Sequence, residues 1–245
     1  MRKFGLIGYP LGHSFSKKYF TAKFENEGIP NCSFDLYEIP KISDFETVLS
    51  ENPELEGMSV TIPYKQEVIP YLDELDPACE AIGAVNCIKI SHEKLKGYNT
   101  DYIGFRLSLE KWLQGLEVKA LVLGTGGASK AVKEALKDLN IEFLSVSRNS
   151  GQGLILYEDL ALNPEILKGH QLIINTTPLG TFPKVEEIPQ IPLEQLNSSH
   201  LVYDLVYNPA ETTLMKACMA AGGKAQNGLK MLELQAEAAW KIWNE

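Results

Sequence analysis

The sequence has few of the features that nucleic-acid binding or membrane insertion requires. Its 245 residues contain 23 Lys and Arg against 32 Asp and Glu, which gives a formal charge of -9 at pH 7 and a pI near 5.1. Nucleic-acid binding depends on clustered basic side chains, so we expect no such partner. No apolar run reaches membrane-spanning length, and the short apolar stretch 4–7 runs into Gly8-Tyr9-Pro10 without forming a signal-peptide pattern.

Cysteine and histidine are scarce and scattered. The chain has 4 of each, with no CxxC pair and no grouping of His with Cys. We therefore expect no metal site, and free thiols in a reducing cytosol are the plain interpretation. The 44% of hydrophobic residues is enough to form the core of one large or two modest domains. This composition is typical of a cytoplasmic α/β enzyme.

The most informative stretch is VKALVLGTGGASKAV, residues 118–132. Residues 120–123 predict a short buried strand, and a run with helical spacing follows the glycine cluster 124–128. A strand that turns through glycines into a helix brings backbone N–H groups and the positive end of the helix dipole together, which favours pyrophosphate binding. Such glycines also occur in tight turns without a ligand, so the context must decide.

A second predicted strand, 141–147, provides that context, because Arg148 stands at its carboxyl end. In dinucleotide-binding folds this end faces the adenosine ribose. A carboxylate there binds the 2′-hydroxyl of NAD, whereas an arginine accommodates the 2′-phosphate of NADP. No Asp or Glu stands beside Arg148, so the sequence favours NADP(H). The alternative is a solvated arginine in a turn.

The remaining chain alternates predicted strands and helices, which indicates an α/β fold with a mostly parallel, covered sheet. A helix at 102–114, which Thr100-Asp101 could cap, leads into the glycine-rich strand, and we place a domain boundary along it. Further strands are expected at 3–8, 33–39, 56–62, 84–90, 94–99, 171–175 and 201–205, with 84–90 and 94–99 as a hairpin, and further helices at 17–27, 42–49, from Pro63 onward, 212–221 and 229–243.

The last predicted helix contains an anomaly. Gln235 lies on the same stripe as Met231, Leu232, Ala238 and Ala239. An amide among apolar neighbours is costly unless it is hydrogen bonded. Gln235 therefore either bonds within the protein or faces a polar ligand.

Seven segments together resemble the shikimate dehydrogenase family: GHSFS (12–16), SVTIPYK (59–65), GAVN (83–86), GYNTD (97–101), LGTGGASKAV (123–132), YDLVYNP (203–209) and NGLKMLELQA (227–236). They follow the family's order along nearly the whole chain. The resemblance implies reversible, NADPH-dependent reduction of 3-dehydroshikimate to shikimate, a step of chorismate and aromatic amino-acid biosynthesis. It implies a substrate-binding domain at 1–101 plus 229–245 and a Rossmann-type NADP-binding domain at 102–228. Between them we expect a cleft that closes on its ligands.

The resemblance also assigns site residues by matching position. Lys65 and Asp101 would form the catalytic pair. The substrate would be bound by Ser14, Ser16 and Tyr207 near its carboxylate and by Thr61, Asn86 and Gln235 at its hydroxyls. The cofactor would be bound by Gly124, Gly126, Gly127, Ala128, Ser147, Arg148, Thr176, Leu205 and Gly228.

Elementary chemistry supports some of these assignments. Reducing a ketone builds negative charge on the carbonyl oxygen, to which Lys65 can donate a proton while Asp101 orients the ammonium. On an extended segment the hydroxyls of Ser14 and Ser16 would point the same way and could bind one carboxylate. The alternatives are a solvated Lys65, Asp101 as a helix N-cap, and an ordinary serine-rich turn.

The chain departs from the family pattern at three places. Lys17 stands where proline is common, one basic residue instead of two follows the strand 141–147, and Lys230 replaces a common glycine. A single arginine would weaken the preference for NADP over NAD. Lys230 would either shift the cofactor or point to solvent.

Two alternatives to the main interpretation stay open. The first is a quinate or dual quinate/shikimate dehydrogenase, which would need room for one more hydroxyl near the substrate carboxylate. The second is a non-catalytic sensor of a shikimate-like acid or NADP(H), for which a Lys65–Asp101 pair would have no purpose. A bare Rossmann domain of unrelated chemistry leaves the first hundred residues unexplained. The oligomeric state, monomer or homodimer, is also open.

Overall fold

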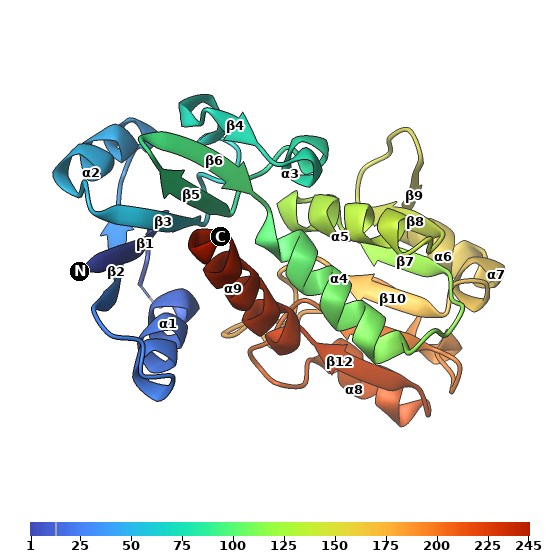
Figure 1. Ribbon diagram of the computed structural model, residues 1–245. Helices are drawn as coiled ribbons and strands as arrows, with labels where there is room; N and C mark the ends of the chain where they lie inside the picture. The colour runs from blue at the N-terminus through green and yellow to red at the C-terminus, as the bar shows by residue number, and fades with distance from the viewer. Residues whose placement is uncertain (13) are drawn as a thin grey trace. The chain divides into compact units, whose positions relative to one another are not determined.

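The computed structural model describes residues 1–12 and 14–245; His13, in the GHSFS segment, lies outside the described residues. The described chain divides into two compact units (Figure 1). Unit 1 comprises Met1–Ile103 and Gln235–Glu245, and unit 2 comprises Gly104–Leu234. Both boundaries fall inside helices, α4 (Thr100–Leu113) and α9 (Leu229–Asn244). The sequence places the boundaries at 101/102 and 228/229, because helix ends are easier to recognise than points within a helix.

Unit 1 is built on a mixed sheet in the order β2-β1-β3-β5-β6-β4. Its strands are β1 (Arg2–Gly8), β2 (Cys32–Glu38), β3 (Leu55–Val60), β4 (Glu74–Leu75), β5 (Cys87–Ser91) and β6 (Lys94–Tyr98). β1 pairs in parallel with β2 and β3, whereas β5 runs antiparallel to β3 and β6. The predicted hairpin is confirmed, and its turn residues His92 and Glu93 both have positive φ, which suits a tight two-residue connection. This reversal makes the sheet mixed.

Helices cover both faces of this sheet. They are α1 (Phe15–Asn26), α2 (Phe45–Glu51), α3 (Pro77–Ile82) and the end of α9. Because side chains alternate along β1, Leu6 packs with Phe20 and Trp243 on one face, whereas Ile7 packs with Phe45 on the other. Each face of the sheet therefore has its own hydrophobic cluster.

The helix expected from Pro63 onward is wrong. Residues 62–68 form successive turns, and only the short 3-10 helix η2 (Ile69–Tyr71) follows. Pro70 lacks the N–H that a continuing α-helix would use. The expected helix 42–49 likewise begins as a 3-10 helix, η1 (Ile42–Asp44), before α2.

Unit 2 is built on an all-parallel sheet in the order β12-β11-β10-β7-β8-β9. Its strands are β7 (Ala120–Leu123), β8 (Phe143–Ser147), β9 (Leu154–Leu156), β10 (Leu172–Asn175), β11 (Leu201–Asp204) and β12 (Lys224–Asn227). The sequence missed two edge strands: β9 is apolar but only three residues long, and β12 (KAQN) lacks an apolar run. β7 lies between β8 and β10, so the chain order reverses there, at the place where open α/β sheets bind ligands.

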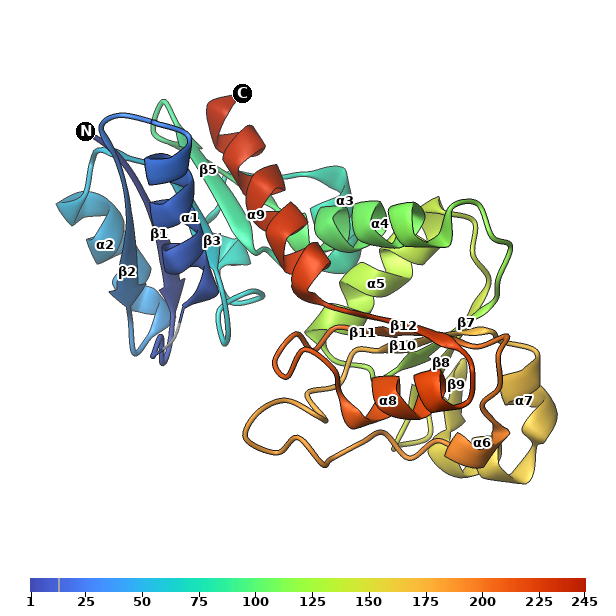
Figure 2. The same ribbon diagram turned by 90° about the horizontal axis from the view of Figure 1, so that it is seen from below.

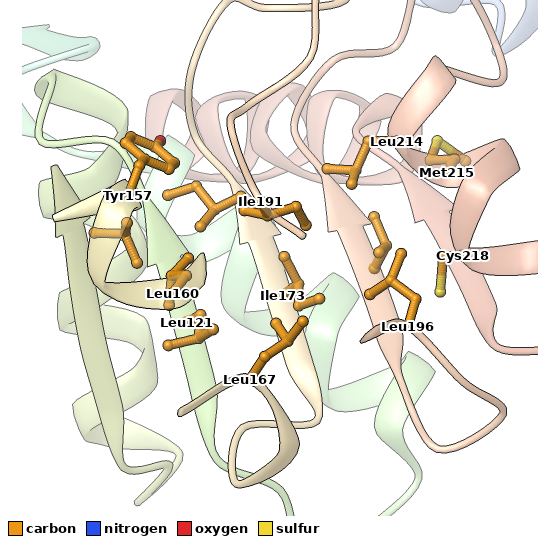
Figure 3. Packing of buried hydrophobic residues seen from close by; sticks show 13 residues of the cluster. Leu121, Tyr157, Leu160, Leu167, Ile173, Ile191, Leu196, Leu214, Met215 and Cys218 are labelled. Atoms are coloured by element: carbon orange, nitrogen blue, oxygen red, sulfur yellow. The ribbon is translucent and has the colours of Figure 1, made fainter. Parts of the chain in front are cut away.

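Helices also cover both faces of the second sheet. α4 and α5 (Gly127–Asp138) lie on one face (Figure 2). The other face is covered by α6 (Tyr157–Leu162), α7 (Pro164–Lys168) and α8 (Thr213–Ala220). Leu193 of the 3-10 helix η3 (Leu193–Gln195) packs against the same hydrophobic cluster. Between these helices and the sheet, Leu121 and Ile173 pack with Leu160 and Leu214 (Figure 3). All four residues of β7 are buried, as expected of a central parallel strand.

Trp243 attaches the end of α9 to the first sheet. Its indole N–H donates to the Ile88 carbonyl at 3.0 Å, and its ring stacks on Phe4 with centroids 5.0 Å apart. Gly57 of β3 lies directly under the indole, where an added Cβ would overlap the ring. Glycine at position 57 therefore allows this close approach.

Replacing Gly57 by alanine should destabilise the protein by about 1–3 kcal/mol, because overpacked cores relax only in part. Urea unfolding followed by circular dichroism measures this cost. The same substitution in a Trp243→Leu background should cost clearly less, because the smaller side chain leaves room for the methyl group. An equal cost in both backgrounds would contradict the packing described for Trp243.

Candidate functional site

A lysine–aspartate pair lies in unit 1. Nζ of Lys65 donates to Oδ2 of Asp101 at 2.6 Å, and the two side chains are 32% and 21% exposed. Asp101 lies in the first turn of α4, where the helix dipole favours a carboxylate. Lys65 lies in the turns after Pro63, and its carbonyl accepts the N–H of Val85 at 2.7 Å. An ammonium has three N–H donors, so the partly exposed Lys65 can bind a ligand while it stays paired.

Asp101 is not the N-cap of α4. Asn99 is the cap, because its Oδ1 accepts the N–H of Tyr102 at 3.0 Å. The Nδ2 of Asn99 donates to the Ala84 carbonyl at 2.9 Å, which holds this buried cap in place. The cap alternative for Asp101 is therefore wrong, and its carboxylate is available to Lys65.

Two of the expected substrate residues belong to one buried hydrogen-bonded group in unit 1. Oδ1 of Asn86 accepts the N–H of Thr100 at 2.6 Å and lies 3.1 Å from its hydroxyl. The same hydroxyl lies 3.2 Å from Oε1 of Gln235. Gln235 therefore has an internal partner. The group connects three places in the chain: Asn86 just before β5, Thr100 at the start of α4, and Gln235 in α9. Thr100, the central residue of this group, directly precedes Asp101 in the sequence.

The serine pair does not lie on an extended segment. Ser14 is the N-cap of α1 and accepts the N–H of Lys17 at 3.2 Å, whereas Ser16 lies inside the helix. The expected alternation of the two hydroxyls is wrong, because helical spacing replaces the period of two. Both serines nevertheless lie at the N-terminal end of α1, where backbone N–H groups and the dipole favour an anion.

The other two expected substrate residues belong to different units. Thr61 directly follows β3 in unit 1, and its N–H donates to the Ile7 carbonyl at 3.0 Å. Tyr207 is a residue of unit 2 and is 44% exposed.

A pocket of about 650 Å³ lies at the carboxyl edge of the parallel sheet in unit 2. Five of the expected cofactor residues line it: Gly124, Gly126, Ser147, Arg148 and Thr176. It is also lined by Thr125, Asn149, Tyr157, Thr177, Pro178, Leu179, Glu187, Ile188 and Gln190. Pro178 and Leu179 belong to the loop 178–180, which the resemblance assigns to the nicotinamide side. Most of the other residues also lie in loops, whose course a sequence pattern does not predict.

The glycine turn between β7 and α5 leaves space for a ligand. Gly124 has a φ of 102°, and a Cβ there would lie 2.9 Å from Oγ1 of Thr176. At Gly126 and Gly127, in contrast, a Cβ would meet no atom of the described chain within 4 Å. Packing therefore does not require glycine at these two positions, but close approach of a ligand to the backbone would. Gly126 is the N-cap of α5 and, lacking a side chain, leaves the first helical N–H groups, including that of Ala128, without a side-chain cap.

The other end of the pocket carries a positive charge. Ser147 ends β8, and its Oγ accepts the N–H of Asn149 at 3.1 Å. The exposed Arg148 lies between them at the carboxyl end of the strand. Glu187 also lines the pocket, but its carboxylate pairs with Lys184 at 3.1 Å. This end can therefore attract an anion.

A buried network fixes the loops that follow β10 and β11. The fully buried Asp204 accepts hydrogen bonds from Oγ1 of Thr212 at 2.7 Å, Nδ2 of Asn175 at 2.9 Å and the N–H of Val206 at 3.0 Å. Burial raises the pKa of Asp204, and these bonds oppose the rise. Oδ1 of Asn175 accepts both the N–H and the hydroxyl of Thr177 in the pocket wall. Sequence reasoning missed Asn175 and Asp204, although polar residues at the ends of two buried strands were a usable signal.

The last two expected cofactor residues, Leu205 and Gly228, pack against each other. A Cβ at Gly228 would overlap the Leu205 carbonyl oxygen, so glycine allows the start of α9 to approach the end of β11. Lys230 pairs with Glu233 one turn along α9 at 2.9 Å, and its side chain is half exposed. This pairing favours the interpretation that Lys230 faces solvent.

The described residues contain neither a metal-binding cluster nor a membrane-spanning helix. In residues 1–12 and 14–245, no three His, Cys, Asp or Glu side chains gather in an arrangement that could hold a metal ion. Within the same residues, every helix is too short or too polar to cross a membrane.

Known proteins are similar in sequence to nearly the whole chain. The sequence model of the shikimate dehydrogenase substrate binding domain matches residues 6–88. A shikimate dehydrogenase (NADP(+)) of Methanococcus maripaludis is 38% identical over 257 residues, which span 98% of this chain and 90% of the relative.

Two solved structures are similar over more than nine tenths of their length. One is a chorismate mutase/shikimate 5-dehydrogenase fusion protein from Clostridium acetobutylicum, with a TM-score of 0.88 and 38% sequence identity. The match covers 100% of this chain and 91% of the Clostridium chain. The other is a shikimate 5-dehydrogenase from Thermus thermophilus in complex with NADP(H) and shikimate, with a TM-score of 0.85 and 29% sequence identity. This match covers 99% of this chain and 93% of the Thermus chain. With the relatedness extending across both units, the chain belongs to the shikimate dehydrogenase family.

Proposed function

We propose that this chain catalyses the reversible, NADP(H)-dependent reduction of 3-dehydroshikimate to shikimate. The observation that carries the proposal is the 2.6 Å pair of Lys65 with Asp101 in a member of this family. A protein that only binds these ligands has no need of such a pair. The name of the Methanococcus relative and the ligands of the Thermus structure support the choice of cofactor and substrate.

The residues at the proposed substrate site provide the proton chemistry. Bound NADPH supplies the hydride. Lys65 donates a hydrogen bond and then a proton to the carbonyl oxygen of the substrate, where negative charge develops. Asp101 accepts one N–H of the ammonium and so orients the remaining donors toward the substrate. In the direction of oxidation, Lys65 takes the proton back.

Unit 1 would bind the substrate. Ser14 and Ser16 would hold its carboxylate with the N-terminal N–H groups of α1, and Thr61, Asn86 and Gln235 would bond its hydroxyls. Oδ1 of Asn86 already accepts from Thr100, so its Nδ2 would be the donor toward a substrate oxygen.

Unit 2 would bind NADP(H), and its pocket fits the cofactor. The space at Gly126 and Gly127 and the N–H groups that begin α5 suit a pyrophosphate. Arg148 at the end of β8 suits the 2′-phosphate, beside Ser147. Thr176 and the loop after it would line the nicotinamide side, with Leu205 and Gly228 near the ring.

The direct test measures initial rates of nicotinamide reduction by the wild-type protein with shikimate and quinate, each with NADP+ and NAD+. We expect shikimate with NADP+ to be the best pair. Comparable rates with quinate would establish the dual enzyme instead. Binding of both ligands without turnover would establish the sensor.

Replacing Lys65 by methionine should lower kcat by about 10²–10⁴-fold, the usual contribution of a general acid, because a nonpolar side chain of similar size has no proton to donate. KM for shikimate and the affinity for NADP+ should change much less. Steady-state kinetics and a fluorescence titration with NADPH measure these quantities. Lys41→Met, at an exposed position of the same unit, is the control. Unchanged turnover in Lys65→Met would remove Lys65 from the mechanism.

Replacing Arg148 by glutamine should raise KM for NADP+ by roughly 10- to 100-fold, because a charged hydrogen bond to phosphate is lost. KM for NAD+, which has a hydroxyl at that place, should stay within about a factor of three on the same reasoning. The matched control is Arg106→Gln, whose arginine pairs with Glu110 on α4 in the same unit. Equal losses for the two cofactors would argue against a phosphate contact.

A further inference from the structure

We infer that the hydroxyl of Tyr157 is a second binding group for the 2′-phosphate of NADP, beside Arg148, and that Tyr157 thereby helps to determine cofactor specificity. The inference rests on the proposed NADP(H) pocket of unit 2. It concerns a residue that the sequence pattern did not single out, in a chain with one basic residue after β8.

Strand register places the two residues together. β8 and β9 pair in parallel, and Ser147 is opposite Leu156. Arg148 and Tyr157 each follow one member of this pair, so they leave the sheet side by side at its carboxyl edge. Both residues line the 650 Å³ pocket, together with Ser147 and Asn149. The tyrosine thus lies at the arginine end of the pocket.

Tyr157 is held by packing and has an uncommitted hydroxyl. The residue is 8% exposed, and its ring belongs to the hydrophobic cluster under the sheet. In Figure 3 its hydroxyl oxygen points away from Leu121 and Leu160 of that cluster. Within residues 1–12 and 14–245, no hydrogen-bond partner for this hydroxyl occurs. The buried side-chain atoms of the described chain that lack a partner do not include this oxygen, so the hydroxyl is accessible although the ring is buried. Because Tyr157 lines the pocket, a ligand there can accept its proton.

The electrostatics favour a neutral donor. Burial raises the pKa of Tyr157, and the positive charge of Arg148 opposes this rise. The hydroxyl therefore keeps its proton at neutral pH and can donate it to an anion. A buried ring allows the hydroxyl little movement, so little conformational entropy is lost when it binds.

The phosphate needs more donors than one arginine supplies. A phosphate monoester carries nearly two negative charges and three acceptor oxygens. After Arg148 the chain continues Asn149-Ser150-Gly151-Gln152-Gly153, without a second basic residue. A tyrosine donor can satisfy an oxygen that the guanidinium leaves open. The ribose 2′-hydroxyl of NAD carries no charge there and would gain less from this donor.

The test measures binding of two adenine nucleotides to the full chain by isothermal titration calorimetry. Adenosine 2′,5′-bisphosphate carries the 2′-phosphate, and adenosine 5′-monophosphate lacks it. In Tyr157→Phe, Kd for the bisphosphate should rise about tenfold, as expected for a lost hydrogen bond to a charged group, and Kd for the monophosphate should stay within about twofold. Combining Tyr157→Phe with Arg148→Gln should give less than the sum of the two losses, because both residues hold one phosphate.

Tyr203→Phe is the matched control, because it removes a buried tyrosine hydroxyl of the same unit, bonded to Ser108 at 2.8 Å. It should leave the ratio of the two nucleotide affinities unchanged. If Tyr157→Phe keeps the wild-type ratio, or weakens both nucleotides equally, Tyr157 does not bind the phosphate, although NADP(H) remains the cofactor. If the wild type itself does not distinguish the nucleotides, the proposed cofactor site fails. Circular dichroism verifies that each variant is folded.

Discussion

Parallel pairing of β7, β8 and β10 is the constraint on which the cofactor pocket depends. Parallel strands end at a common edge, and here the chain order reverses at β7, so three loops diverge from one place. The glycine turn before α5, Arg148 and Thr176 follow these three strands and line one pocket. The strands are mostly apolar, so recognition is left to Ser147 at the end of β8 and to the residues directly after the strands. Tyr157 enters the same wall only because β9 extends the sheet beside β8.

Hydrogen bonds of buried amides and carboxylates hold the loops at both candidate sites. In unit 2, Asp204 and Asn175 connect the loops after β10 and β11. In unit 1, Asn99 caps α4 and Asn86 binds its first N–H group. A buried polar group without its partner costs free energy, so each network favours one loop conformation. The Lys65–Asp101 pair differs, because it is partly exposed and adds little to stability. The proposed role of this pair is proton transfer rather than stabilisation of the fold.

Competition between neighbouring side chains for backbone N–H groups explains why the predicted helix starts are wrong. Ser14 and Asn99 are N-caps, so α1 and α4 each begin two residues before the predicted starts at 17 and 102. Ser16 and Asp101 therefore lie inside helices. Helix starts shift by one or two residues when neighbouring side chains compete for the same N–H groups. Turns replace the helix expected after Pro63, and Pro70 has no N–H with which a helix could continue. Such choices depend on a few hydrogen bonds, and apolar periodicity does not detect them.

By itself, the sequence determined the α/β class, the order of most strands and helices, the glycine turn, and the identity of Lys65, Asp101 and Arg148 as candidates. The fold class, the elements, the glycine turn and Arg148 follow from periodicity, glycine and local charge, which act over a few neighbouring residues. Lys65 and Asp101 follow from the resemblance to the family, which their residue types fit chemically. Only the tertiary structure decided that Lys65 and Asp101 pair and that Tyr157 stands beside Arg148. Both juxtapositions join segments that are apart in sequence, and strand register and packing, which are cooperative over a whole unit, determine them.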